Sequence, residues 1–153
     1  MKITEILPPE LVIAALQGDS KDRVLRELAE RMAALHPEID ANRLIEVLWD
    51  RERLGSTGIA DGIAIPHGKL PGLRSVVAAF GRHPRGVDFQ SLDGNPTKLF
   101  FLLVAPEDSV GLHLKALARV SRLLKEPSFR ERLITAANED ELYRIIREED
   151  DKY

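Results

Sequence analysis

The sequence contains no cysteine and few aromatic residues, which make up 5% of its 153 positions. The absence of cysteine excludes disulfide bonds, thiol catalysis and cysteine-ligated zinc. No apolar run is long enough to cross a membrane, and the N-terminal residues show no basic region followed by an apolar one. A net charge of −3 gives no reason to expect nucleic acid as a partner. We therefore expect a cytoplasmic protein that is not membrane-embedded.

The rest of the composition, 44% hydrophobic and 31% charged, is typical of a globular protein. Apolar spacing and capping residues predict helices that begin after Ser20, Asp40, Ser109, Ser128 and Asn138. Apolar runs predict strands at residues 11–16, 75–81, 87–89 and 98–105. Because helices and strands alternate, we expect one α/β domain over residues 1–153, with a mixed central sheet flanked by helices on both faces. We expect His83 to be exposed and residues 148–152 to form a frayed acidic tail.

Residues 51–72 hold five of the ten glycines in the chain. Glycine is concentrated where the backbone turns sharply or approaches a ligand closely. Within this stretch Pro66 fixes its own φ and favours an extended Ile65, so His67 should leave a short strand in a rigid direction. Two interpretations stay open from the pattern alone: a rigid support for a nucleophilic or ligating imidazole, and a glycine-rich turn with an incidental histidine.

A second candidate is an arginine near the end of a predicted helix. The apolar stripe of this helix continues onto Arg51 and Glu52, which places both near the buried face. A buried guanidinium costs free energy unless an anion receives it. The alternatives are a side chain that extends to the surface and an ion pair with a nearby carboxylate.

A third candidate lies in the first turn of the helix predicted after Ser109. His113 shares a stripe with Leu117, Val120 and Leu124, so it should face the interior just beyond a central strand. The alternative is a core histidine that is hydrogen-bonded to the backbone.

Together Arg51, His67 and His113 suit a phosphoryl group carried on nitrogen. A neutral imidazole is the nucleophile and a guanidinium neutralises phosphoryl oxygens. No nucleotide-binding phosphate loop or kinase-like loop is present, which argues against direct use of a nucleotide. A different class, a metal-dependent hydrolase, would use both histidines with Glu52 or Asp61, but these spacings match no metal motif.

The segment LGSTGIADGIAIPHGKLPG, with RE upstream and GLHLKALARVSRLL downstream, resembles the type-2 IIA domains of the bacterial phosphoenolpyruvate-dependent phosphotransferase system. The likeness covers nearly the whole chain and is greatest to the nitrogen-regulatory branch. It implies that a histidine-containing phosphocarrier protein phosphorylates His67, on Nε2, and that Arg51 and His113 line the pocket. It further implies support of the pocket by Ser56, Thr57, Gly62 and Gly68, and no metal or other cofactor.

The resemblance implies a phosphotransferase component whose phosphoryl group has two possible destinations. Regulatory relatives bind target proteins according to phosphorylation state, such as proteins of potassium transport or nitrogen metabolism. Sugar-specific relatives of the fructose or mannitol type pass the group to a IIB domain. The amino-acid sequence of the motif favours the regulatory type. A separate IIB, or a regulatory binding module that no longer accepts phosphate, are the alternatives.

Overall fold

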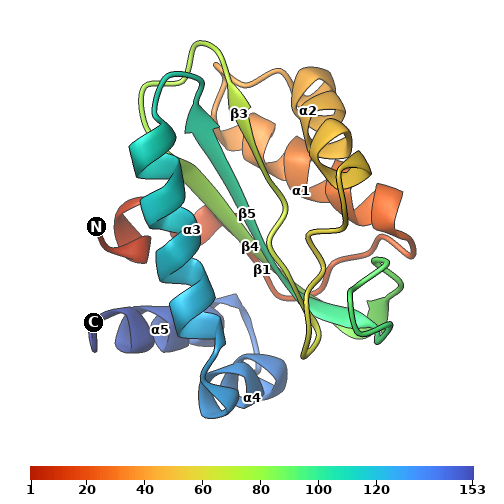
Figure 1. Ribbon diagram of the computed structural model, residues 1–153. Coiled ribbons are helices and arrows are strands. Elements are labelled where there is room, and N and C mark those ends of the chain that lie inside the picture. The colour runs from red at the N-terminus through yellow and green to blue at the C-terminus, as the bar shows by residue number, and fades with distance from the viewer.

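The computed structural model describes residues 1–153, and in it a mixed sheet lies between two layers of helices (Figure 1). The α-helices are α1 (Lys21–Leu35), α2 (Ala41–Arg53), α3 (Val110–Leu124), α4 (Pro127–Thr135) and α5 (Glu139–Asp150). The strands are β1 (Val12–Ile13), β2 (Ile63–Ala64), β3 (His67–Leu70), β4 (Val77–Val87) and β5 (Thr97–Pro106). Two short 3₁₀ helices, η1 (Ile3–Glu5) and η2 (Pro9–Leu11), precede β1. No helix is both long and apolar enough to cross a membrane.

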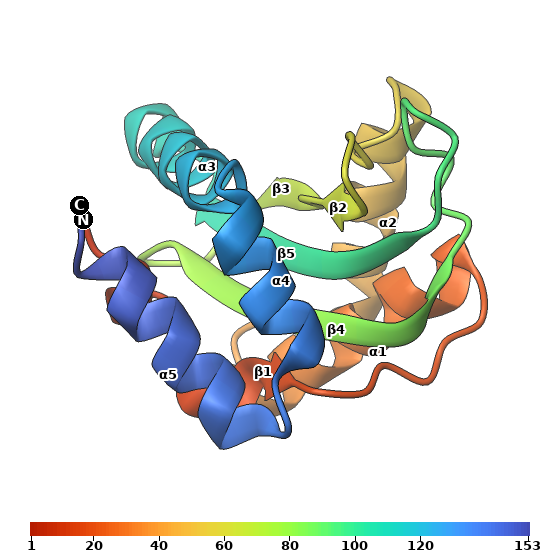
Figure 2. The same cartoon turned by 90° about the horizontal axis from the view of Figure 1, so that it is seen from below.

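Strand β5 is the centre of the sheet, whose order is β1-β4-β5-β2 with β3 also paired to β5. β4 and β5 are antiparallel, whereas β2 and β3 run parallel to β5 and β1 runs parallel to β4. Helices α1 and α2 cover one face and α3, α4 and α5 cover the other (Figure 2). This arrangement confirms the predicted mixed sheet with helices on both faces. It also explains why β5 is almost entirely apolar, since a strand covered on both faces buries every side chain.

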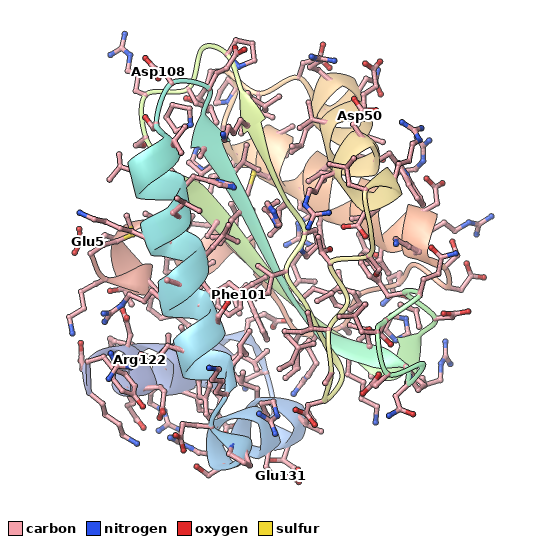
Figure 3. The ribbon with its side chains drawn as sticks, viewed as in Figure 1. Glu5, Asp50, Phe101, Asp108, Arg122 and Glu131 are labelled. Carbon is pink, nitrogen blue, oxygen red and sulfur yellow. The ribbon has the colours of Figure 1, made fainter.

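Apolar side chains are buried between the layers, and charged side chains lie on the outer surfaces. Phe101 of β5 is 1% exposed, whereas Asp50, Arg122 and Glu131 project from the outer surfaces of helices (Figure 3). The buried apolar residues of both layers form one contiguous cluster around the sheet.

The edge of the sheet is interrupted where the glycine-rich stretch passes along β5. β2 and β3 pair with the same edge of β5 and are separated by Ile65 and Pro66. Pro66 has no N–H to donate, but its carbonyl accepts a hydrogen bond from the Leu103 N–H at 3.0 Å. The chain therefore stays attached to β5, and His67 opens β3 opposite Leu103.

Helix starts were predicted correctly after Ser109, whose side chain makes no capping bond, and at three helices where a side chain caps the first turn. Ser20 accepts from the Arg23 N–H, Asp40 from the N–H groups of Asn42 and Arg43, and Asn138 from the Glu141 N–H. The predicted start after Ser128 is wrong. Helix α4 begins one residue before it, at Pro127, because proline is well suited to the first helical position, where its missing N–H is not needed.

Three further expectations need correction. Only Val12 and Ile13 of the predicted strand 11–16 pair in the sheet, and the predicted strand 87–89 is replaced by one long β4 that ends at Val87 after an irregularity. His83 is buried, with 4% exposed, because its Nε2–H donates to the Gly18 carbonyl at 2.8 Å and its Nδ1 accepts from the Gly86 N–H at 2.9 Å.

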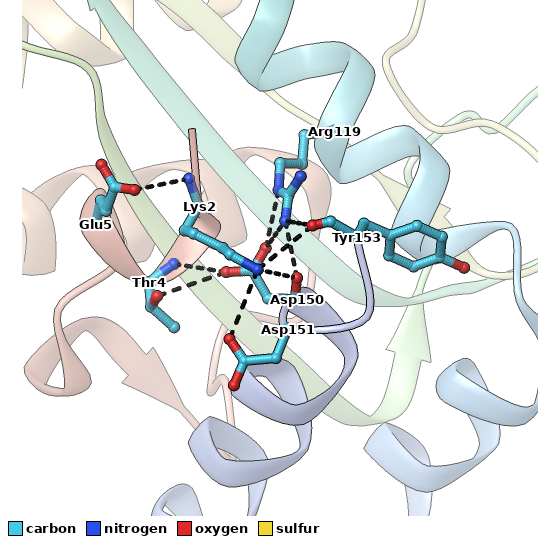
Figure 4. A network of polar contacts seen from close by, with 7 residues as sticks. All are labelled: Lys2, Thr4, Glu5, Arg119, Asp150, Asp151 and Tyr153. Atoms are coloured by element: carbon cyan, nitrogen blue, oxygen red, sulfur yellow. Dashed lines mark hydrogen bonds and ion pairs between the residues drawn. The ribbon is translucent and has the colours of Figure 1, made fainter.

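The predicted acidic tail is not frayed either. Helix α5 continues to Asp150, and this residue is fully buried. Its carboxylate pairs with Arg119 of α3 and accepts from the Thr4 N–H (Figure 4). A tail that is anchored by a buried ion pair joins the end of the chain to its beginning.

Close packing of α2 on β3 predicts the effect of a single methyl group. A Cβ on Gly68 would lie 2.5 Å from Cγ1 of Val47, closer than real Cβ contacts allow. We expect Gly68→Ala to lower the free energy of unfolding by about 1–3 kcal/mol, since the helix must move or a rotamer must strain. Urea unfolding of purified protein measures this.

The matched control is Gly111→Ala in α3, where an added Cβ meets nothing within 4 Å. It should be neutral or stabilise by up to about 1 kcal/mol, because alanine is the better helix former. Adding Val47→Ala to Gly68→Ala should restore part of the loss. Equal unfolding midpoints for Gly68→Ala and Gly111→Ala would contradict the close packing of α2 on β3.

Candidate functional site

The three histidine and arginine candidates meet in an open cleft of about 490 Å³ at the edge of the sheet. The last turn of α2 supplies Arg51, strand β3 supplies His67, and the first turn of α3 supplies His113. These residues are far apart in the sequence. They are brought together because α2 packs on β3 and α3 packs on β5.

Both ring nitrogens of His67 have defined partners. Nδ1 lies 2.8 Å from the Ile65 carbonyl oxygen, and Nε2 lies 3.2 Å from Nε of Arg51. A carbonyl can only accept a hydrogen bond and a guanidinium can only donate one. The two contacts therefore select the same tautomer, with the proton on Nδ1 and the lone pair on Nε2.

Arg51 has no carboxylate partner. It is half-buried, and its Nη1 donates to the Gly55 carbonyl at 2.9 Å while its Nε donates to His67. No Asp or Glu oxygen lies within ion-pairing distance of its guanidinium, so the ion-pair alternative is not realised. The positive charge is held in place by neutral acceptors and stays available to an anion.

His113 packs against His67 with 5.3 Å between ring centroids. Its side chain faces the interior, as predicted, and the residue is 6% exposed. The core-histidine alternative requires a hydrogen bond to the backbone, but Nδ1 of His113 is buried without any partner. Buried polar atoms are rarely left unsatisfied, and Nδ1 of His113 lacks the backbone bond that the core-histidine alternative supposes.

Both histidines are held neutral. Burial lowers the pKa of His67, as does the charge of Arg51, while the hydrogen bond to Ile65 and the charge of Glu52 act in the opposite direction. Burial also lowers the pKa of His113, to about 4, with smaller contributions from His67 and Lys69. The first turn of a helix also disfavours a charged ring, but burial is the largest cause for His113. A neutral imidazole is what a nucleophile or a hydrogen-bond donor to phosphate needs.

Lys69 is a cleft residue that the sequence analysis missed. It lines the same cleft as His67 and His113. The signal was present, since residues two apart on a strand share a face and Lys69 follows His67 by two. Its charge increases the positive potential of the site.

The four residues expected to support the pocket have different places. Gly68 lines the cleft, where the absence of a side chain lets α2 approach β3. Gly62 adopts a φ of 75°, and its carbonyl accepts from the N–H groups at the start of β5. Ser56 and Thr57 lie behind the cleft: the hydroxyl of Ser56 donates to the Phe89 carbonyl, and Thr57 binds Glu52.

The residues of the metal-dependent alternative are separated. The carboxylate of Glu52 lies 2.8 Å from Nζ of Lys21, and that of Asp61 lies 3.8 Å from Arg130. No group of three His, Asp or Glu side chains in the chain is arranged to hold a metal ion. Neither carboxylate of this alternative is therefore arranged with the two cleft histidines to hold a metal ion.

Comparisons with known proteins found relatives that match nearly the whole chain. The family model described as phosphoenolpyruvate-dependent sugar phosphotransferase system, EIIA 2, matches residues 5–149. The chain is 42% identical to a nitrogen regulatory protein of Bradyrhizobium diazoefficiens, over 95% of each chain. It is 37% identical, over 98% of its length, to 24% of a fructose-specific EIIABC component of Bacillus subtilis. The crystal structure of a nitrogen regulatory protein IIA-Ntr from Neisseria meningitidis superposes with a TM-score of 0.87 at 34% identity, covering 94% of this chain and 98% of that one.

The lowered pKa of His113 predicts a pH dependence of stability. Between pH 6.5 and about 4 the unfolded state binds a proton on this ring that the folded state does not, so the free energy of unfolding falls as the pH falls through this range. At about 1.4 kcal/mol per pKa unit, the loss attributable to His113 is about 3 kcal/mol.

The measurement is the free energy of unfolding of wild type and His113→Gln between pH 7 and pH 4. Carboxylates titrate equally in both proteins, so the wild type should lose more stability by about 2–3 kcal/mol. Parallel curves for wild type and His113→Gln would contradict the prediction.

Proposed function

Because this chain belongs to the EIIA 2 family of the phosphoenolpyruvate-dependent sugar phosphotransferase system, and is therefore a phosphotransferase component, we propose that it carries a phosphoryl group on Nε2 of His67. One observation carries the proposal. The proton of His67 is fixed on Nδ1 by Ile65, which leaves the Nε2 lone pair facing a guanidinium that has no carboxylate partner.

The transfer needs no base. The Nε2 lone pair forms a new P–N bond while the bond between phosphorus and the imidazole nitrogen of the donor breaks, and the donor imidazole leaves with its electron pair. The proton on Nδ1 stays in its hydrogen bond with Ile65. The His67 ring gains positive charge as the bond forms, and the Ile65 carbonyl stabilises that charge.

The surrounding residues stabilise the transferred group. Arg51 now donates to the lone pair that must attack, so its guanidinium has to turn toward the phosphoryl oxygens as they arrive. His113 lines the cleft beside His67, and its neutral imidazole can donate one ring N–H to the same oxygens. Lys69 adds a further positive charge at the edge of the cleft. Phosphoryl transfer depends mostly on such positioning and charge.

The proposed donor is a histidine-containing phosphocarrier protein in the cytoplasm, and the proposed role is regulation of target proteins by phosphorylation state. The cleft is open, and its rim carries Leu54, 83% exposed, and Leu114, 59% exposed. Apolar side chains exposed around a charged centre suit a protein partner better than a small hydrophilic substrate. Relatives named nitrogen regulatory protein, matched along nearly their whole length, support the regulatory role.

A sugar-specific role is the second candidate, because the chain also matches part of a fructose-specific component at 37% identity. In this case the group would move from His67 to a IIB domain. Loss of the label from the phosphorylated protein to an added fructose-type IIB domain would favour this candidate. Retention of the label, with binding of a target in only one phosphorylation state, would favour regulation.

The proposed function predicts which residue is phosphorylated. Incubation with phosphoenolpyruvate, the first enzyme of the system and a phosphocarrier should give acid-labile phosphate on wild type and none on His67→Ala. His113→Ala should be labelled more slowly, and His36→Ala should behave as wild type. Phosphorus-31 NMR of the product identifies the ring nitrogen. Labelling of His67→Ala but not of His113→Ala would make His113 the phosphorylated residue. A wild type that takes no label would favour the alternative of a regulatory binding module that does not accept phosphate.

The proposed function also predicts how the charge of Arg51 affects the transfer rate. Hydrogen bonds to charged groups contribute about 1.5–3 kcal/mol, so Arg51→Ala should slow transfer about ten- to hundred-fold. Arg51→Lys should recover only part of the rate, because the planar fork is lost. Rapid-quench kinetics measure both.

Arg53→Ala is the matched control, since Arg53 lies in the same turn of α2 but pairs only with the exposed Asp50. Its rate should equal that of wild type. If Arg51→Ala instead lowers the melting temperature and leaves the rate unchanged, Arg51 is structural.

A further inference from the structure

A buried carboxylate that the transfer step does not use lies directly beside the site. Glu52 follows Arg51 in the last turn of α2, and its side chain is 1% exposed. Its Oε1 lies 2.8 Å from Nζ of Lys21 in α1, whose side chain is 7% exposed. Burying two charges is costly and often contributes nothing to stability compared with apolar residues. A role in positioning would account for charges at this place.

Glu52 holds the loop that follows α2. The Thr57 N–H donates to its Oε1 at 3.0 Å, and the Thr57 hydroxyl donates to its Oε2. Lys21 in turn lies over the ring of Phe89, 4.7 Å from the centroid, and donates to the side chain of Gln90. Helix α1, the loop after α2 and the segment after β4 are thus fixed at one ion pair.

A chain of hydrogen bonds leads from Thr57 to the phosphoryl site. The Thr57 carbonyl accepts from the Ile65 N–H at 3.1 Å, and the Ile65 carbonyl accepts from Nδ1 of His67 at 2.8 Å. The same loop carries Gly55, whose carbonyl accepts from Arg51. Displacement of the loop would therefore move the hydrogen-bond partners of both Arg51 and His67.

We propose that the buried Lys21/Glu52 pair is a positioning device for the phosphoryl site, acting through Thr57 and Ile65. By holding Thr57, Glu52 keeps the Ile65 carbonyl where it fixes the proton on Nδ1 of His67 and leaves Nε2 as the nucleophile. Glu52 and Lys21 touch neither His67 nor the transferred group. The consequence for transfer rate rests on the proposed function, whereas the consequence for the His67 tautomer does not.

The chain contains a second buried ion pair that serves as a matched control. Asp150 is fully buried, its Oδ1 lies 2.7 Å from Nη2 of Arg119, and its Oδ2 accepts from the Thr4 N–H at 3.1 Å and from the Thr4 hydroxyl at 3.5 Å (Figure 4). The groups are the same as at Glu52: one carboxylate, one cation and both donors of one threonine. This pair joins α5, α3 and the N-terminal segment, and none of its hydrogen bonds reaches His67 or its partner Ile65.

The experiment compares Glu52→Gln and Thr57→Val with Asp150→Asn in the full chain. Three quantities are measured: the His67 tautomer by nitrogen-15 NMR of the imidazole, the rate of transfer from the phosphorylated carrier, and the unfolding midpoint. We expect Glu52→Gln and Asp150→Asn both to be less stable. Only Glu52→Gln and Thr57→Val should reduce the fraction of His67 protonated on Nδ1, and slow transfer about ten- to hundred-fold, as misplacement of a reacting group does.

Replacing both charges separates folding from positioning. The double variant Lys21→Met/Glu52→Met removes the buried charges together, so it should fold stably, yet it leaves Thr57 without its acceptor and should transfer slowly. The proposal is overturned if Glu52→Gln and Thr57→Val keep the wild-type tautomer and rate, or if Asp150→Asn slows transfer equally. A wild type that takes no phosphoryl group, while Glu52→Gln still alters the tautomer, would refute the proposed function and leave the positioning role.

Discussion

Strand β3 pairs with only one neighbour, β5, and this one-sided pairing is the constraint on which the site depends. Because β5 is buried on both faces, its position is set by the whole core. The free edge of β3 leaves room for the end of α2 and the start of α3 to approach from opposite faces of the sheet. A histidine at the start of such a strand is held rigidly by the core and remains open to another protein.

Charge is the second determinant of the site. Arg51 and Lys69 line the cleft, and both histidines are kept neutral there largely by burial. A phosphoryl group reverses this balance: one negative charge about 4 Å from a ring is worth about 4 kcal/mol at an effective dielectric constant of 20. That exceeds the roughly 3 kcal/mol by which burial and the neighbouring charges disfavour the protonated ring of His113. An anion on His67 would therefore favour a proton on His113, and the cleft would differ in charge as well as in shape between the two states.

The sequence predicted those features that depend on local pattern. The apolar stripes of α2 and α3 placed Arg51 and His113 correctly. The proline before His67 was expected to make this residue leave a short strand, whereas His67 opens strand β3. Predictions failed where distant residues decide the outcome. His83 is buried because the Gly18 carbonyl, 65 positions earlier, accepts its proton. Lys69 was overlooked although its two-residue spacing from His67 places both side chains on one face of β3.

The two buried ion pairs show most clearly what a local pattern leaves open. Glu52 and Asp150 are both acidic residues at the C-terminal ends of helices, where the helix dipole disfavours negative charge. Each is retained because a cation and a threonine from another part of the chain satisfy it. What distinguishes them is the direction of the next hydrogen bond. From Glu52 it leads through Thr57 toward the edge strand, whereas from Asp150 it leads to the N-terminal segment. The same chemistry therefore serves the site in one place and the joining of the termini in the other.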